Sequence, residues 1–83
     1  MERKEVYEVL DGERKYQDEK WGGKHNDNLH EVESFMIYMQ HNMNEAIKAV
    51  STERGTQGAL EHLRKVVALG VACFEVHGVS ERK

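Results

Sequence analysis

The segment from Arg14 to Asp27 collects residue types that bind phosphate and flat aromatic ligands. Its sequence, RKYQDEKWGGKHND, runs from charged residues into the chain's only tryptophan, Trp21, which two glycines follow. Lysine and arginine hold phosphate through charge-assisted hydrogen bonds, an indole ring offers a stacking surface, and glycines let a ligand approach the backbone. Arg14, Lys20 and Trp21 are therefore candidate ligand-binding residues. The alternative is that Trp21 plugs the end of a helical bundle.

A second set of polar residues falls on two predicted helices, at 29–50 and 59–77. The set consists of His41, Asn42, Glu45, Glu61, His62 and Lys65. Residues three or four positions apart share one side of a helix, so each half of the set gathers on one face. One interpretation is that these two faces line a binding site. The alternative is a solvated face on which Glu61 and Lys65 form an ordinary surface ion pair.

Other chemical patterns are weak. The spacing His25-x-Asp27-x-x-His30 offers imidazole and carboxylate groups to a metal, but a tight zinc site needs four ligands, and such histidines more often form hydrogen bonds or caps. Cys73 lies inside an apolar run and is expected to be an inert core thiol. The glycine clusters match neither the phosphate-loop nor the dinucleotide-binding signature. We predict no catalytic nucleophile.

The sequence predicts an all-α fold in a single domain, residues 1–83, with helices at about 2–20, 29–50 and 59–77. The middle helix is the most periodic, because its apolar residues recur at spacings of three and four and predict one core-facing stripe. That stripe consists of Val32, Phe35, Met36, Met39, Met43, Ala46, Ile47 and Val50. Turn-forming residues cluster between the predicted helices, at 22–28 and 51–58.

The third helix predicts self-association. Its run VVALGVACF, from Val66 to Phe74, is apolar around the whole helix, so it must be buried on several sides. Three helices cannot easily surround it, and a chain of 83 residues buries little surface alone. We therefore expect a homo-oligomer whose copies complete a four-helix-type or larger bundle. The alternative is that the run is the centre of a monomeric bundle.

The composition of the chain limits the classes of partner that we expect it to bind. The chain has 12 Lys and Arg against 15 Asp and Glu, a net charge of -3, and no long block of either sign, so nucleic acid is an unlikely partner. One cysteine permits no internal disulfide, and the charged N-terminus has no apolar signal region. We expect a cytoplasmic protein with no membrane partner.

Three segments carry a family resemblance: ERKYQDEKWGGKHND, NEAIKAV and LRKVVALGVACFE. Together they resemble the MazG-like, all-α nucleoside triphosphate pyrophosphatases, in particular short members from phages and prophages. The resemblance covers about residues 10–76. It implies a helical bundle, assembly as a dimer or tetramer with a nucleotide site between subunits, and magnesium-dependent hydrolysis in active members.

The acidic residues of the active family are mostly replaced in this chain. The resemblance places His41 and Asn42 at the family's paired glutamates, and His62 and Lys65 at its Glu-x-x-Asp pair; only Glu45 keeps a carboxylate, as a metal ligand if a metal binds at all. Magnesium requires several oxygen ligands, and an ammonium group repels it. We therefore expect no cofactor, with magnesium only under an enzymatic alternative.

These substitutions suggest that the chain still binds a nucleotide but no longer hydrolyses it. Lys65 and His62 replace acids with groups that hold phosphate directly. The sequence thus favours a non-hydrolysing binder of a nucleotide or nucleotide-derived signal at a subunit interface, which in a phage would act as a sequestering, counter-defence protein. Two alternatives stay open: a magnesium-dependent nucleoside triphosphate pyrophosphatase, and a helical module that binds another protein.

Overall fold

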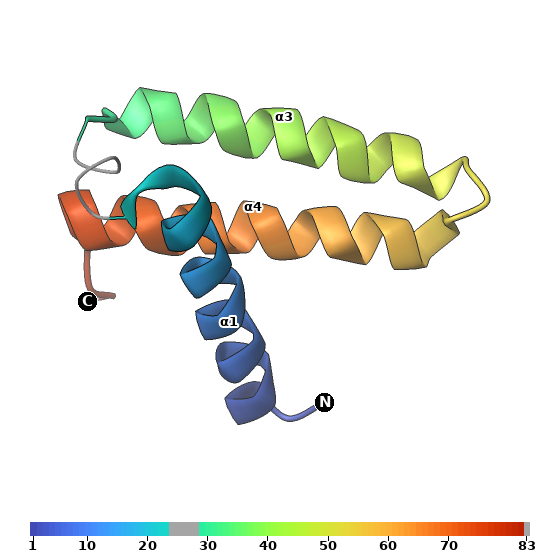
Figure 1. Cartoon of the computed structure of the whole chain (residues 1–83), viewed down its shortest axis with the longest axis horizontal. Coiled ribbons are helices and arrows are strands. Elements are labelled where there is room, and N and C mark those ends of the chain that lie inside the picture. The colour runs from blue at the N-terminus through green and yellow to red at the C-terminus, as the bar shows by residue number, and fades with distance from the viewer. Residues whose placement is uncertain (24–28, 83) are drawn as a thin grey trace.

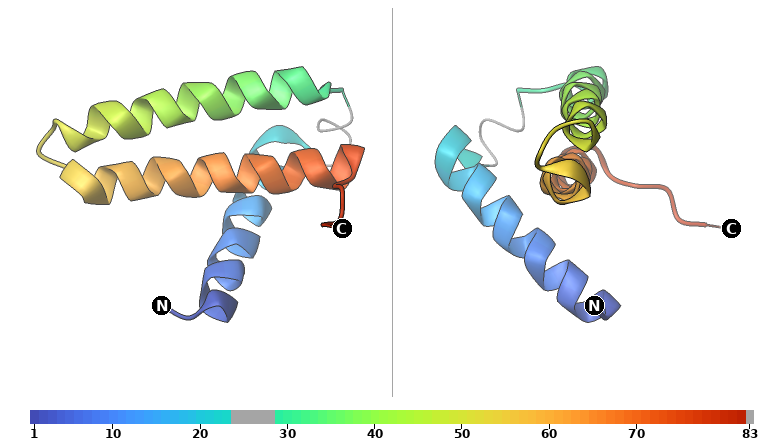
Figure 2. Two further views of the ribbon diagram at one scale, coloured as in Figure 1. Left: turned by 180° about the vertical axis from the view of Figure 1, so that it is seen from behind. Right: turned by 90° about the vertical axis from the view of Figure 1, so that its right-hand side faces the viewer.

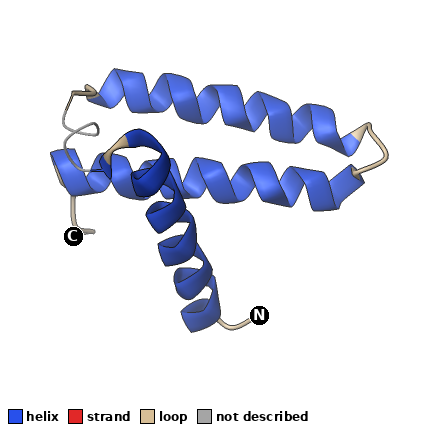
Figure 3. Ribbon diagram, in the orientation of Figure 1, coloured by secondary structure: helices blue, strands red, loops and turns tan. Residues whose placement is uncertain are grey.

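A computed structural model describes residues 1–23 and 29–82, and every regular element in those ranges is helical. The helices are α1 (Arg3–Trp21), α3 (Val32–Val50) and α4 (Gly55–His77). Figure 1 shows α3 and α4 side by side and antiparallel, with α1 crossing α4 steeply. Figure 3 shows the same arrangement coloured by secondary structure. The predicted all-α class is confirmed.

Local hydrogen bonds explain the ends of α1. At its start, the Glu2 backbone N–H donates to the Glu5 carboxylate over 3.0 Å, and the two residues form a capping box. At its end, Gly22 adopts a left-handed conformation (φ 90°), and its N–H donates to the Asp18 carbonyl over 3.0 Å. Glycine enters this conformation without steric penalty, so the helix stops directly after Trp21.

Helix α3, the second of the three predicted helices, begins later than the sequence predicts, at Val32 instead of residue 29. Glu31 is extended (ψ 166°) and cannot belong to the helix. Just before it, the His30 carbonyl accepts a hydrogen bond from His77 Nε2 over 2.9 Å. This bond ties the start of α3 to the last residue of α4.

Helix α4, the third of the predicted helices, begins earlier than the sequence predicts, at Gly55 instead of residue 59. Gly58 looks like a turn residue in the sequence, but it lies inside α4 where the hairpin is tight. A Cβ at Gly58 would lie 2.6 Å from Arg54 Cβ and 3.3 Å from Ala49 Cβ. Gly58 therefore serves close packing of α4 against the end of α3.

Helix α4 is the centre of the fold, because α3 and α1 both pack against it and, within the described residues, not against each other. The end-on view in Figure 2 shows α1 standing apart from α3, on one side of the α3/α4 hairpin. None of the described helices is long and apolar enough to cross a membrane.

The core is small and lies between α3 and α4. Its central cluster is Phe35, Ala72 and Cys73, with Val76 packed against it. Phe35 is 2% exposed and also meets the rings of His30 and His77 edge to face. Cys73 is buried, as expected for a residue of the apolar run.

The apolar stripe predicted as core in α3 is only partly buried, so that prediction was too broad. Phe35 and Ala46 are buried, whereas four other members are exposed: Val32, Met36, Ile47 and Val50. A single neighbour, α4, covers less than the width of the stripe. The apolar run of α4 behaves in the same way, with Leu69 buried and Val67 and Phe74 about half exposed.

Replacing Phe35 tests this core. Phe35→Ala removes the largest fully buried side chain, and we expect the free energy of unfolding to fall by about 3–5 kcal/mol. The neighbouring Ile37 is 68% exposed, so Ile37→Ala is the matched control and should change it by no more than about 0.5 kcal/mol. Urea unfolding followed by circular dichroism measures both. Equal losses in the two variants would place the core elsewhere.

Candidate functional site

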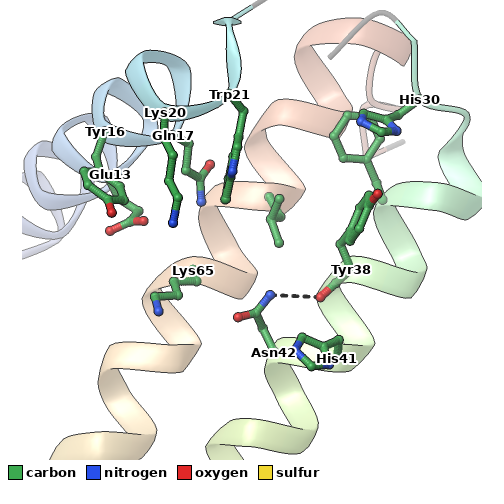
Figure 4. A pocket seen from close by; sticks show the side chains of 12 residues that line it. Glu13, Tyr16, Gln17, Lys20, Trp21, His30, Tyr38, His41, Asn42 and Lys65 are labelled. Atoms are coloured by element: carbon green, nitrogen blue, oxygen red, sulfur yellow. Dashed lines mark hydrogen bonds between the residues drawn. The ribbon is translucent and has the colours of Figure 1, made fainter. Parts of the chain in front are cut away.

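One wall of a cavity is built by α1. Glu13, Gln17 and Trp21 recur every four residues, so they share one side of the helix, and all three line the cavity. Tyr16 and Lys20 line it from the flank of the same helix. Figure 4 shows these side chains directed from α1 toward the space above α3 and α4. The helical repeat therefore gathers a carboxylate, an amide, a cation and two aromatic rings.

Lys20 lies against both aromatic rings of this wall. Its Nζ is 5.4 Å from the centroid of the Trp21 ring and 5.8 Å from that of Tyr16. Both distances fall within the range of cation–π attraction. The rings thus hold the ammonium group at the cavity without neutralising its charge.

The opposite walls come from α4 and α3. Lys65 and Leu69 line the cavity from α4, and the α3 side supplies His30, Phe35, Tyr38, His41 and Asn42. Asn42 Nδ2 donates to the Tyr38 carbonyl over 3.0 Å, which fixes the amide on the surface of α3. The His30 ring meets Tyr38 edge to face, with the ring centroids 5.4 Å apart. In Figure 4 the two lysines lie toward one side of the cavity and Tyr38 and His30 toward the other.

The cavity has a volume of about 590 Å³, which is the size range of small-molecule sites. Its ionisable lining includes one carboxylate, Glu13, whose side chain is 7% exposed and accepts a hydrogen bond from Arg64 Nε over 2.7 Å. This ion pair offsets the charge of Glu13. Among the described lining residues the charges of Lys20 and Lys65 then dominate, and the cavity is suited to an anionic ligand that also carries a flat ring.

The structure brings together Lys20, Trp21 and Lys65, three of the predicted ligand-binding residues, in one cavity. Arg14 does not line it. The Arg14 side chain is almost buried and donates hydrogen bonds to Gln17 Oε1 and Asp18 Oδ1, both over 2.9 Å, and to Glu75 Oε1 over 3.4 Å. Arg14 therefore fastens α1 to α4, and its part in the site is to position the cavity wall.

His62 does not line the cavity either. Its Nδ1 is buried and has no hydrogen-bond partner within the described residues. Glu45, the candidate metal ligand, also lies outside the lining, and its Oε1 is 3.6 Å from Lys48 Nζ. In residues 1–23 and 29–82, no three His, Cys, Asp or Glu side chains cluster as metal ligands would. His25 and Asp27 lie outside the described residues.

Sequence reasoning left out two lining residues that matter for chemistry, Gln17 and Tyr38. Gln17 lies four residues before Trp21, so the helical repeat alone would have placed it on the same wall. Tyr38 lies on the side of α3 that faces away from the exposed apolar stripe. No pattern in the sequence marks it as a site residue. No protein-family model matches the chain, and neither a curated protein nor a solved structure shows significant similarity to it.

Replacing Arg64 tests how much its ion pair with Glu13 contributes to stability. Arg64→Gln removes the partner of a nearly buried carboxylate, so we expect the free energy of unfolding to fall by about 1–3 kcal/mol. Adding Glu13→Gln removes the charge that was left without a partner, and should recover part of that loss. A double-mutant cycle measured by urea unfolding gives the coupling between the two residues. Strictly additive effects would show that the pair does not stabilise the docking of α1.

Proposed function

We propose that this chain binds a nucleotide or nucleotide-derived anion in the cavity between α1, α3 and α4, and does not hydrolyse it. The observation that carries the proposal is the convergence of Lys20 and Trp21 from α1 with Lys65 from α4 on one cavity. Lysines bind phosphate, and aromatic rings stack on a base. A nucleotide combines these two features, and its size suits the cavity.

Absence of hydrolysis is supported by the charges that the chain places at the site. A magnesium-dependent pyrophosphatase needs clustered carboxylates. Glu13 is already paired with Arg64, Glu45 lies near Lys48, and Lys65 brings positive charge into the cavity. This pattern fits a MazG-like protein that has kept its ligand pocket and lost its metal site. In a phage, such a cytoplasmic protein would sequester a host nucleotide signal.

Self-association is the second part of the proposal. Leu60, Val67 and Phe74 recur every seven residues along α4, and all three are exposed. Such spacing is typical of a seam between packed helices. We propose that a second copy of the chain covers this seam, because these side chains are uncharged and the core of one copy is small. Trp21 is 47% exposed at the rim of the cavity, where a neighbouring copy can help to enclose the ligand.

Titration calorimetry with ATP, GTP, CTP and UTP tests the binding site. We expect Lys65→Gln to weaken binding by about 1.5–3 kcal/mol, through loss of a charge-assisted contact. Trp21→Ala should cost about 1–3 kcal/mol, through loss of stacking. Lys48→Gln is the matched control, because Lys48 is a largely exposed lysine outside the cavity and should leave affinity unchanged.

Two results would contradict this assignment. If Lys65→Gln and Trp21→Ala stay folded and bind as tightly as the wild type, the site is elsewhere and Trp21 only plugs the bundle. If the wild type releases pyrophosphate in the presence of magnesium, and Glu45→Gln abolishes that turnover, the pyrophosphatase alternative is correct. If no nucleotide binds and none is hydrolysed, the remaining alternative is that the chain is a helical module that binds another protein.

Val67→Glu tests self-association. A glutamate there would be buried without a partner in the proposed interface, so the variant should be a monomer at micromolar concentration, where the wild type is an oligomer. Gln57→Glu adds the same charge at an exposed position of α4 before the apolar run, and should leave the assembly intact. Sedimentation equilibrium measures the mass of each. A wild-type mass equal to one chain would reject self-association without affecting the nucleotide site.

A further inference from the structure

Gln17 is the most buried polar residue of the cavity wall, with 2% of its surface exposed. It lies on α1 between Glu13 and Trp21, one helical turn from each. A buried amide normally satisfies both its oxygen and its nitrogen with hydrogen bonds. Gln17 satisfies only the oxygen, because Nε2 is buried and has no partner among the described residues.

The orientation of this amide is fixed by Arg14. Arg14 Nη1 donates to Gln17 Oε1 over 2.9 Å, and the same guanidinium is held by Asp18 and Glu75. A guanidinium has no acceptor, so the amide oxygen must face it, and the NH₂ group must face away. In Figure 4 the Gln17 amide nitrogen points between Lys20 and Trp21, toward the open space above Lys65. A donor that has no partner in the described part of the chain is thus held at the cavity.

We propose that Gln17 is a specificity-determining residue, whose Nε2 donates a hydrogen bond to an acceptor on the base of the bound nucleotide. This inference rests on the proposed nucleotide-binding function. A base stacked on Trp21 would present its edge one helical turn away, where Gln17 lies. The acceptor is a carbonyl oxygen or a ring nitrogen, and the phosphates extend toward Lys20 and Lys65.

The opposite wall complements this donor. Asn42 Nδ2 is engaged by the Tyr38 carbonyl over 3.0 Å, which leaves its Oδ1 as the acceptor of that side chain. Figure 4 shows this oxygen directed toward Lys65, on the other side of the cavity from Gln17. Discrimination by such groups is strong, because a ligand that lacks the matching atom leaves the buried donor without a partner.

The test compares nucleotides with a probe that has no base. Wild type and Gln17→Glu are titrated with ATP, GTP, CTP, UTP and inorganic triphosphate. The glutamate keeps an oxygen for Arg14, so the variant should fold, but it replaces the NH₂ donor by an acceptor. Its added charge weakens all five probes through their phosphates. The ratio of nucleotide affinity to triphosphate affinity therefore isolates the contact to the base.

We expect this ratio to fall by about tenfold for the nucleotide that the wild type binds best. Gln17→Leu, which lacks the donor without adding charge, should lower the same ratio and hardly change triphosphate affinity. If both variants leave the ratio unchanged, Gln17 does not contact the base, while nucleotide binding that depends on Lys65 would still stand. If the wild type binds none of the five probes, the proposed function fails and this inference fails with it.

Discussion

Two ion pairs between α1 and α4 hold the candidate site together. Helix α1 packs only against α4 within the described residues, and polar contacts from Glu13 to Arg64 and from Arg14 to Glu75 join the two helices. The side chains of Glu13 and Arg14 are nearly buried, so these contacts are less exposed to solvent screening than surface pairs. Because Glu13, Gln17 and Trp21 follow one another along the same side of α1, fastening its central turn places the whole wall.

The cavity that results is polarised. Lysines lie toward one side, where Lys20 also rests on the Trp21 and Tyr16 rings, and the rings of Tyr38 and His30 lie toward the other. The pair of Glu13 with Arg64 prevents the buried carboxylate from cancelling the lysine charges. An anion with a flat ring matches this lining, because the lysines attract its charge and the aromatic rings offer surfaces for stacking.

The small size of the core bears on the interpretation of the exposed apolar residues of α3 and α4. Within the described residues the central buried cluster consists of Phe35, Ala72 and Cys73, while several large apolar side chains on α3 and α4 are exposed. Coverage of the proposed α4 seam by a second copy would add to this limited buried surface. Ligand binding and assembly would then reinforce each other if the neighbouring copy encloses the rim near Trp21.

The sequence by itself determined the helical class, the approximate end of α1 before the turn residues at 22–28 and three residues that line the cavity, because periodicity and turn chemistry are local properties. It did not determine that Gly58 lies inside α4, since that depends on the close approach of Ala49 from another helix. Nor did it separate Arg14, which fastens α1 to Glu75, from Lys20, which lines the cavity, because both are cations on one helix. Only the docking of α1 on α4 decided which cation became structural, and it left the Gln17 amide nitrogen without a partner among the described residues.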